Sequence, residues 1–296
     1  MLADRTRLHI ALQKSGRLSD LSRDLLRDAG FRIQHSKNSL TARVENFPAE
    51  LMFVRDDDIP TFVSDGVCEF GVVGQNVLEE FALGEDEQRY EVLAELGFGG
   101  CSLKIAAPEM LAYDGPKSLA GERIATSYPR IVRRYLDEKG IEATVVKMNG
   151  AVELAPRLQI ANFVCDLVST GATLEANGLR PVERVLDSQA VLIRTAKALD
   201  DTRGQLAAGL LTRVDGVLAT KESKYIMLNA TSESLKQITS LLPGVEAPTI
   251  VPLHGRPGHF AVHAVCQESV FWETLEKLKG AGASAILVVP IEKMMM

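Results

Sequence analysis

Residues Asp166 to Thr173 read Asp-Leu-Val-Ser-Thr-Gly-Ala-Thr, and the order of these residue types decides how the surrounding chain folds. A largely apolar run from Phe163 to Val168 has the character of a strand, and the segment from Ala172 to Ala176 has that of a helix. Small hydroxyl residues and one glycine separate them. The stretch therefore predicts a strand, a tight loop and the beginning of a helix.

A loop of this kind suits a phosphate group. The first backbone N–H groups of a helix have no partners within the helix, and the helix dipole adds partial positive charge there. Gly171 lets the backbone approach an anion closely, and Ser169, Thr170 and Thr173 would add hydroxyl donors. The alternative is an ordinary strand-to-helix turn with Thr173 as the helix cap.

Two further strand-loop junctions carry cations. Lys14 and Arg17 follow a predicted strand at Leu8–Leu12, where they would suit a polyphosphate or would form a solvated basic loop. Arg55 follows a strand at Leu51–Val54, and its guanidinium could bind a phosphate with two parallel hydrogen bonds.

The aspartates after Arg55, at positions 56 to 58, are expected to stabilise the start of a helix. A further junction has Gly74 after the strand Phe70–Val73, with a helix from Asn76 as another anion-facing helix start. Because strands and helices alternate, we expect an α/β fold with a mainly parallel sheet and ligands at the carboxyl ends of its strands.

The glycine-rich stretch Leu96–Cys101 predicts a crossing from one lobe to another, and the extended segment Val182–Arg194 predicts the return. Before the central loop, residues 149 to 153 are expected to lead into a helix. Glu153 would then be an acidic first-turn residue. Alternatively, Glu153 and Asp166 form a carboxylate pair that faces a magnesium pyrophosphate, since Mg²⁺ needs only one or two carboxylates beside waters and substrate phosphates.

The last eighty or so residues change character and alternate in the order βαββαβ, the pattern of a ferredoxin-like module. The expected elements are a strand at Tyr225–Ala230, a helix at Glu233–Leu242, strands at Thr249–Leu253 and Phe260–Gln267, a helix at Val270–Gly280 and a strand at Ala285–Pro290.

Composition narrows the class of protein. The chain of 296 residues is 46% apolar and 24% charged, which suits a soluble protein of two or three domains. Its net charge of −6 provides no basic surface for nucleic acid or for an anionic membrane. No apolar run approaches the length of a membrane span, the first residues carry charges without an apolar segment behind them, and we expect a cytoplasmic protein. The four cysteines are scattered and are expected to be reduced core thiols, with only Cys101 in unusual surroundings.

The motifs together resemble the long form of the ATP phosphoribosyltransferase family, which catalyses the first step of histidine biosynthesis. The resemblance runs through nearly the whole chain. The segments that carry it are Gln13–Leu18, Arg55–Pro60, Gly71–Gly74, Gly99–Cys101, Ala125–Pro129, Asp166–Gly178, Glu222–Tyr225 and Pro290–Met294.

The resemblance implies two catalytic lobes like those of type II periplasmic binding proteins, followed by an ACT-like domain that binds histidine. Lobe I would comprise residues 1–98, completed by about 181–212, lobe II residues 99–180, and the regulatory domain residues 218–296. The implied reaction joins ATP and phosphoribosyl pyrophosphate with Mg²⁺, releases pyrophosphate and is inhibited by L-histidine. Dimers that interconvert with hexamers are the implied assembly.

The site residues are assigned by combining this resemblance with the chemistry. The 5-phosphate is assigned to the loop Ser169–Thr173, which includes Ala172, and the ribose hydroxyls or their metal to Asp166 and Glu153. Phosphates of ATP or the leaving pyrophosphate are assigned to Lys14, Arg17 and Arg55. Gly74 and Cys101 complete the substrate-binding set, and Glu222, Ser223, Thr249 and Leu253 are the expected histidine contacts.

Two other classes of protein remain to be compared with this interpretation. A solute-binding protein with an appended sensor domain would have the same two lobes, but it would need an export signal and has no use for cationic and acidic junctions around one cleft. An amino-acid-responsive regulator would need a basic helix-turn-helix pattern, and the sequence shows none.

Overall fold

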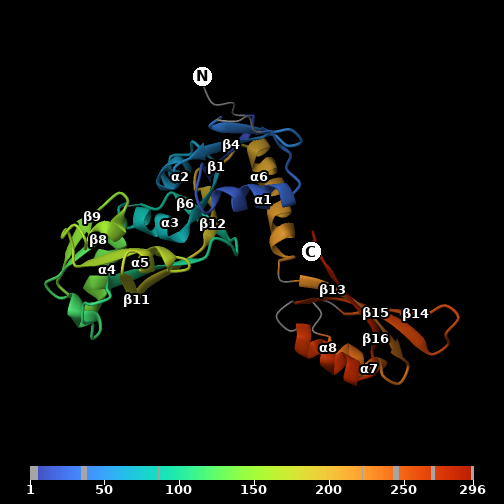
Figure 1. Ribbon diagram of the computed structural model, residues 1–296. Helices are drawn as coiled ribbons and strands as arrows, with labels where there is room; N and C mark the ends of the chain where they lie inside the picture. Colours follow the sequence, from blue (N-terminus) through green and yellow to red (C-terminus); the bar gives the residue numbers. More distant parts are fainter. Residues whose placement is uncertain are drawn as a thin grey trace. The chain divides into compact units, whose positions relative to one another are not determined.

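The computed structural model describes residues 6–34, 39–85, 87–221, 223–242, 247–267 and 271–294. The chain divides into two compact units. The first comprises Met1–Arg27 and Phe31–Ala207, and the second comprises Asp28–Gly30 and Ala208–Met296. Two sheets belong to the first unit and one sheet to the second (Figure 1).

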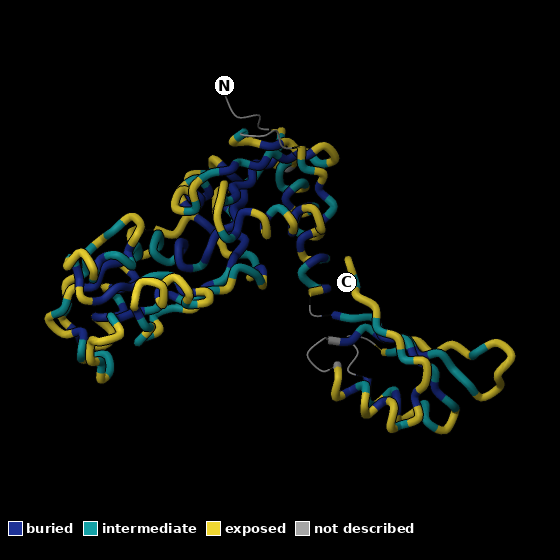
Figure 2. Tube along the Cα trace, in the orientation of Figure 1, coloured by how far each residue is buried: buried dark blue, intermediate teal, exposed yellow. Residues whose placement is uncertain are grey.

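The first sheet has seven strands in the order β2-β3-β4-β1-β5-β12-β6, and we call the part of the first unit built on it lobe I. Its central strand β1 is buried from Leu8 to Leu12 and is apolar there except for His9, as expected for a strand covered on both faces (Figure 2). The strands of lobe I are β1 (Leu8–Gln13), β2 (Ile33–Gln34), β3 (Thr41–Val44), β4 (Ala49–Val54), β5 (Phe70–Gly74), β6 (Tyr90–Glu95) and β12 (Ala190–Thr195). Its helices are α1 (Ser19–Asp28), the 3-10 helix η1 (Asp56–Asp58), α2 (Ile59–Ser64) and α3 (Gln75–Ala82).

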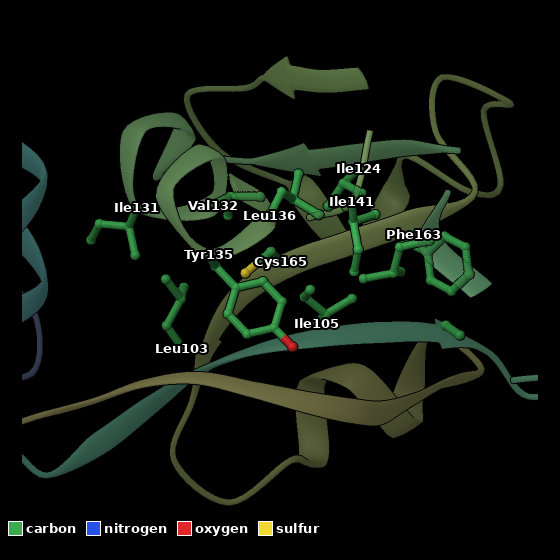
Figure 3. Packing of buried hydrophobic residues seen from close by; sticks show 12 residues of the cluster. Leu103, Ile105, Ile124, Ile131, Val132, Tyr135, Leu136, Ile141, Phe163 and Cys165 are labelled. Atoms are coloured by element: carbon green, nitrogen blue, oxygen red, sulfur yellow. The ribbon is translucent and has the colours of Figure 1, made fainter. Parts of the chain in front are cut away.

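The second sheet has five strands in the order β11-β7-β10-β8-β9 and forms lobe II. Helix α4 covers one face of this sheet, where its apolar side chains pack against Leu103, Ile105, Phe163 and Cys165 (Figure 3). The strands are β7 (Cys101–Pro108), β8 (Arg123–Thr126), β9 (Thr144–Lys147), β10 (Phe163–Val168) and β11 (Leu179–Ser188). The helical segments are η2 (Pro116–Leu119), α4 (Pro129–Lys139), η3 (Val152–Leu154) and α5 (Ala172–Ala176).

The chain crosses between the lobes twice. The first crossing joins β6 to β7 and the second joins β11 to β12, and the two crossings hydrogen-bond to each other at Leu96 N–H to Ala190 O (2.9 Å) and Ala190 N–H to Phe98 O (3.0 Å). In each sheet the strand next to a crossing runs antiparallel to its neighbours, β7 in lobe II and β12 in lobe I. The expectation of a mainly parallel sheet is therefore wrong: both sheets are mixed, because each crossing returns the chain in the opposite direction and because β2, β3 and β4 of lobe I follow one another as antiparallel neighbours. This strand order confirms the predicted two-lobed type II core.

Helix α6 (Asp201–Leu218) leads from lobe I towards the second unit. Its first turn is attached to lobe I by an ion pair of 2.9 Å between Arg203 Nη1 and Glu69 Oε1. Glu69 is buried and also accepts the N–H of His9 at 2.6 Å. The return crossing lies between Ser188 and Ala190, later in the chain than residue 181.

The second unit confirms the predicted ferredoxin-like module. Its four-stranded sheet has the order β14-β15-β13-β16, and each neighbouring pair is antiparallel. Alternate residues of β13, such as Ile226, Leu228 and Ala230, are buried beneath the helices. The elements are β13 (Ser223–Thr231), α7 (Leu235–Leu241), β14 (Thr249–Pro252), β15 (His259–Gln267), α8 (Phe271–Gly280) and β16 (Ser284–Pro290).

Candidate active site

The cations Lys14 and Arg55 lie side by side at one edge of lobe I. Strands β1 and β4 are parallel and in register up to Gln13 opposite Val54, and the N–H of Lys14 donates to Val54 O at 2.8 Å. Both side chains are exposed. The structure therefore brings together two cations that are far apart in the sequence.

Arg17 belongs to the same edge. The loop before it is closed by Gln13, whose Oε1 accepts the N–H of Leu18 at 3.0 Å. Nη1 of Arg17 is shielded from solvent, and among the residues that the structure describes it has no hydrogen-bond partner. A buried guanidinium nitrogen of this kind costs free energy until an acceptor reaches it, so it favours an anionic ligand at this edge.

Gly74 lies at the end of β5, immediately before α3. The first N–H groups of α3 already have partners, since Gln75 N–H donates to Gln189 O (2.9 Å) and Asn76 N–H to Ser188 Oγ (3.1 Å). A Cβ on Gly74 would lie 2.5 Å from Oδ1 of the buried Asn76. The absence of a side chain on Gly74 therefore leaves room for Asn76. The first N–H groups of α3 hydrogen-bond to the return crossing rather than facing an open anion site.

Asp166 lies on the face of the second sheet opposite α4. Its neighbour Cys165 points towards α4, so alternation along the strand directs Asp166 to the other face, which η3 and α5 cover (Figure 3). Burial raises the pKa of the Asp166 carboxyl, and the nearby charge of Glu153 raises it further, against the lowering effect of the Leu167 N–H that donates to its Oδ1 at 2.8 Å. Glu153 is therefore near enough for its charge to act on Asp166, and the predicted carboxylate pair stays a prediction.

Glu153 reaches this position through a backbone that differs from the expectation. The α-helix predicted after residues 149 to 153 is absent, and a single 3-10 turn, Val152–Leu154, takes its place. Ala151 precedes it in the left-handed region with φ of 50°, and Val152 is buried against the sheet. Glu153 is thus part of a 3-10 turn on the face of the sheet that also carries Asp166.

The loop after β10 has the predicted shape. Gly171 has φ of 88°, in the left-handed region that glycine adopts without strain, and α5 follows with only five residues. The N-cap residue of α5 is Gly171, and Thr173 lies inside the helix, so the alternative in which Thr173 is its cap is wrong. Ser169, Thr170, Ala172 and Thr173 are exposed, while Leu174 is buried and attaches the helix to the sheet.

A pocket of about 620 Å³ lies between the lobes next to this loop. Ser169 lines it, as do Cys101, Ser102 and Lys104 of β7 and residues of the return crossing. Lys104 was missed by sequence reasoning, although it is a lone charge in an apolar strand.

Tyr128 was also missed, and it lies between the lobes. Its side chain packs against the cores of both lobes, and its hydroxyl accepts a hydrogen bond of 2.9 Å from Nδ2 of Asn76. Burial and the charges of Asp56 and Asp166 raise the pKa of Tyr128, so the phenol stays protonated. The motif Ala125–Pro129 contained the signal, but no property of the sequence separated this tyrosine from a core residue.

The acidic turn η1 faces lobe II. Partial desolvation raises the pKa of Asp57, and so do the charges of Asp56 and Asp58, whereas Arg55 and Lys147 lower it. Lys147 ends β9 in lobe II, so charged groups of both lobes interact at this place. Charges of η1 in lobe I therefore act on groups of lobe II, and Tyr128 is influenced both by these charges and by Asp166.

Comparison with known proteins gives this site a family. The profile of the family described as ATP phosphoribosyltransferase matches residues 55–216, more than half of the chain, and the profile described as the C-terminal domain of HisG matches residues 220–293. The chain belongs to the ATP phosphoribosyltransferase family. Enzymes of this family are pentosyltransferases of histidine biosynthesis, as the sequence motifs predicted.

One of the similar solved structures supports the fold. A chain of the ATP phosphoribosyl transferase (HisG:HisZ) complex from Thermotoga maritima superposes with a TM-score of 0.60 at 23% identity, over 71% of this chain and 97% of that one. The alkanesulfonate-binding protein SsuA from Xanthomonas axonopodis pv. citri, bound to MOPS, gives a TM-score of 0.47 at 17% identity over 72% and 74%. A periplasmic binding protein from Brucella ovis with glutathione bound gives a TM-score of 0.47 at 8% identity, over 73% of this chain and 69% of that one. The last two are too distant to inform on the ligand of this chain.

In this member of the ATP phosphoribosyltransferase family, a carboxylate of lobe I connects the lobes. Glu80 of α3 accepts the N–H of Arg130 (3.0 Å to Oε1 and 3.1 Å to Oε2) and that of Ile131 (3.0 Å), at the start of α4 in lobe II. Glu79 forms an ion pair with Arg134 on the next turn of α4. We call these contacts the Glu80 clamp.

The expected histidine contacts do not gather within one chain. Ser223 is buried and pairs with Gln267 at one end of β15, whereas Leu253 bonds to His259 at the other end, and Thr249 pairs with His263 between them. Eight residues of strand separate the two ends, about 26 Å. Glu222 lies outside the described residues.

Two general properties complete the description. Among the described residues, no helix combines the length and apolar character that a membrane span requires. All four cysteines are free thiols, and Cys68, Cys165 and Cys266 are buried as expected. Burial raises the pKa of Cys68 to about 12, which leaves its thiol unreactive.

Proposed function

We propose that this chain transfers the 5-phosphoribosyl group of phosphoribosyl pyrophosphate to N1 of ATP and releases pyrophosphate, as the committed step of histidine biosynthesis. One observation supports this most strongly: the half-buried Asp166, whose pKa the charge of Glu153 helps to raise, ends a strand that leads into an exposed loop in lobe II, and lobe I carries Lys14 and Arg55 side by side at one edge of its sheet.

The chemistry requires this distribution of charge. Adenine N1 is a neutral nucleophile that attacks C1 of the ribose, and the electron pair of the C1–O bond leaves with pyrophosphate. Positive charge develops on the sugar while negative charge develops on the leaving group. Carboxylates beside the ribose and cations beside the phosphates stabilise both, so that positioning and electrostatics suffice without a covalent nucleophile.

The roles follow from this scheme. The loop Ser169–Thr173 binds the 5-phosphate, and Asp166 with Glu153 binds the ribose hydroxyls. Lys14, Arg17 and Arg55 bind phosphates of ATP or the leaving pyrophosphate. Gly74 and Cys101 are proposed as nearby substrate contacts, with Gly74 acting through the space it leaves for Asn76.

Mg²⁺ fits the carboxylate pair. Burial and the like charge of Glu153 both raise the pKa of Asp166, a divalent cation would offset this cost, and carboxylate oxygens are the hard ligands that Mg²⁺ prefers. Asp166 and Glu153 would bind the ion, which would neutralise charge on the pyrophosphate when bound. The protein itself orients the two substrates around it.

We further propose that L-histidine inhibits the enzyme by binding to the second unit, in a homo-oligomer that interconverts between dimer and hexamer. Ser223 and Leu253 lie too far apart in one chain to bind one amino acid, so a site that includes both needs a second copy. Histidine must bind the active and less active assemblies unequally in order to inhibit. The proposed location of the enzyme is the cytoplasm.

The test is an absorbance assay with purified protein, ATP, phosphoribosyl pyrophosphate, Mg²⁺ and pyrophosphatase, repeated with L-histidine. The spectrum of an N1-substituted adenine is expected to grow, and histidine is expected to slow its growth. Binding of ATP without any spectral change would favour the rival interpretation of a solute-binding protein. Unchanged rates with histidine would contradict the regulatory role of the second unit.

A further inference from the structure

The structure assigns a binding role to Lys104: we infer that its ammonium group neutralises the 5-phosphate of phosphoribosyl pyrophosphate above the loop Ser169–Thr173. This inference rests on the proposed function. It adds a residue that neither the sequence motifs nor the family comparison singled out.

Strand register brings Lys104 to the loop. Lys104 on β7 is paired directly with Asp166 on β10, and Ser102 is paired with Val168, the last residue before the loop. Directly paired residues of antiparallel strands point to the same face. Lys104 therefore shares the face of Asp166, which α5 and η3 cover, and it lines the same 620 Å³ pocket as Ser169.

The ammonium group of Lys104 is available. In the part of the chain that the structure describes, it takes part in no hydrogen bond and no ion pair, and its side chain is half-buried. The register places Arg184 of β11 on its other side, but Arg184 is already paired with Asp187 at 3.2 Å. Ser102 Oγ donates to the same Asp187 at 2.7 Å. Of the two basic residues on this face of β7 and β11, Lys104 is the one without a counter-charge.

The loop itself needs such a cation. Residues 166 to 176 contain the acidic Asp166 and Glu175 and no basic residue. The carboxylate of Glu175 lies near the loop, since a Cβ on Gly171 would be 3.9 Å from its Oε1. A phosphate monoester carries about −1.5 to −2 charges at neutral pH. The N–H and hydroxyl donors of the loop would have to bind it against two carboxylates, so a cation on the same face would strengthen binding.

The 5-phosphate is the favoured ligand, rather than the pyrophosphate. The cations Lys14, Arg17 and Arg55 at the edge of lobe I are available for pyrophosphate or ATP, whereas Lys104 is on the lobe that carries the loop. Ribose 5-phosphate has the 5-phosphate monoester but no pyrophosphate group, whereas inorganic pyrophosphate has no 5-phosphate monoester. The two compounds therefore distinguish the two roles.

The experiment measures binding of phosphoribosyl pyrophosphate, ribose 5-phosphate and pyrophosphate by calorimetry to wild type, Lys104→Gln and Lys104→Arg. Lys117→Gln is the control, an exposed lysine of the same lobe. Lys104→Gln is expected to lower the affinity for ribose 5-phosphate and phosphoribosyl pyrophosphate about 10- to 100-fold and to leave the affinity for pyrophosphate unchanged. Lys104→Arg should retain most of the affinity, and Lys117→Gln should bind like wild type. Circular dichroism of each variant establishes that it is folded.

Equal affinity of wild type and Lys104→Gln for ribose 5-phosphate would overturn the assignment of Lys104 while leaving the proposed function intact. If Lys104→Gln lost affinity only for pyrophosphate, the assignment would also be overturned, and Lys104 would instead contact the leaving group. If wild type itself bound none of the three compounds, the proposed function would fail together with this inference.

Discussion

Replacing Glu80 tests how the two lobes are joined. Its carboxylate accepts the N–H groups of Arg130 and Ile131, which are orphan donors of the first turn of α4, and its side chain is only 15% exposed. Loss of an N-terminal cap costs about 0.5–2 kcal/mol, and loss of a negative charge at a helix start adds about 0.3–1 kcal/mol. Glu80→Ala should therefore lower the free energy of opening of this turn by about 2 kcal/mol, and Glu80→Gln by about 1 kcal/mol, because the amide oxygen still accepts.

Native-state hydrogen exchange reads this free energy at the N–H groups of Arg130 and Ile131. A loss of about 2 kcal/mol corresponds to exchange roughly 30 times faster at these positions. The matched control is Glu138→Gln, which removes an exposed ion pair of 3.6 Å with Arg134 on the same helix and should change exchange by less than about 0.5 kcal/mol. If Glu80→Ala left the exchange of both amides unchanged, the Glu80 clamp would not stabilise the junction of the lobes.

Three other perturbations have defined outcomes. Burial and the charge of Glu153 raise the pKa of Asp166 in the folded protein, so folding stability is lost as pH rises from about 4, the pKa of an unfolded aspartate, through the folded pKa. In calorimetric scans Asp166→Asn should therefore melt at a higher temperature than wild type at pH 8 but not at pH 3.5. Burial favours the neutral form of Glu69, but hydrogen bonds and charge from His9 outweigh it and lower the pKa of Glu69. Wild type should lose stability as pH falls through that lowered pKa, and Glu69→Gln should cost roughly 3 kcal/mol at pH 7 in urea unfolding, since Arg203 loses its buried partner. Gly171→Val, at φ of 88°, should leave the circular dichroism spectrum intact and abolish binding of phosphoribosyl pyrophosphate in calorimetry; retained turnover would contradict the loop assignment.

Local patterns predicted the parts of this fold that depend on neighbouring residues. The segment Ala172–Ala176 is helical with the predicted bounds, and the strands of the second unit follow the βαββαβ order. Each of these elements is decided by apolar periodicity and by glycines at its ends. The crossing at Leu96–Cys101 was also visible, because three glycines, at positions 97, 99 and 100, interrupt the apolar pattern there.

Features that depend on distant residues could not be predicted in the same way. The direction of β7 and β12 depends on where the chain crosses between the lobes, which no local window contains. Lys104 becomes a candidate binding residue only because its strand pairs with β10, some 60 residues later in the chain. The separation of Ser223 from Leu253 follows from the order of strands in the third sheet. The 3-10 turn that carries Glu153 replaces an α-helix because Ala151 adopts a left-handed conformation, which alanine rarely does.

The pairing of Asp166 with Glu153 shows how far sequence reasoning about a site extends. Two carboxylates near strand ends suggested a pair, but an acidic first-turn residue was an equal alternative. The structure shows that Glu153 belongs to a 3-10 turn rather than to the first turn of an α-helix, and that its charge helps to raise the pKa of Asp166. The chemical roles of the two residues remain predictions that an assay must test.

The most direct test of the account is the rate at which N1-phosphoribosyl-ATP forms in wild type, in Asp166→Asn and in Asp114→Asn, followed by mass spectrometry of the product. Asp114 is an exposed loop residue of the same lobe and serves as the matched control. The account predicts that wild type and Asp114→Asn form the product equally fast and that Asp166→Asn is slower by at least about 100-fold. A wild type that forms no product, or an Asp166→Asn variant as fast as wild type, would contradict it.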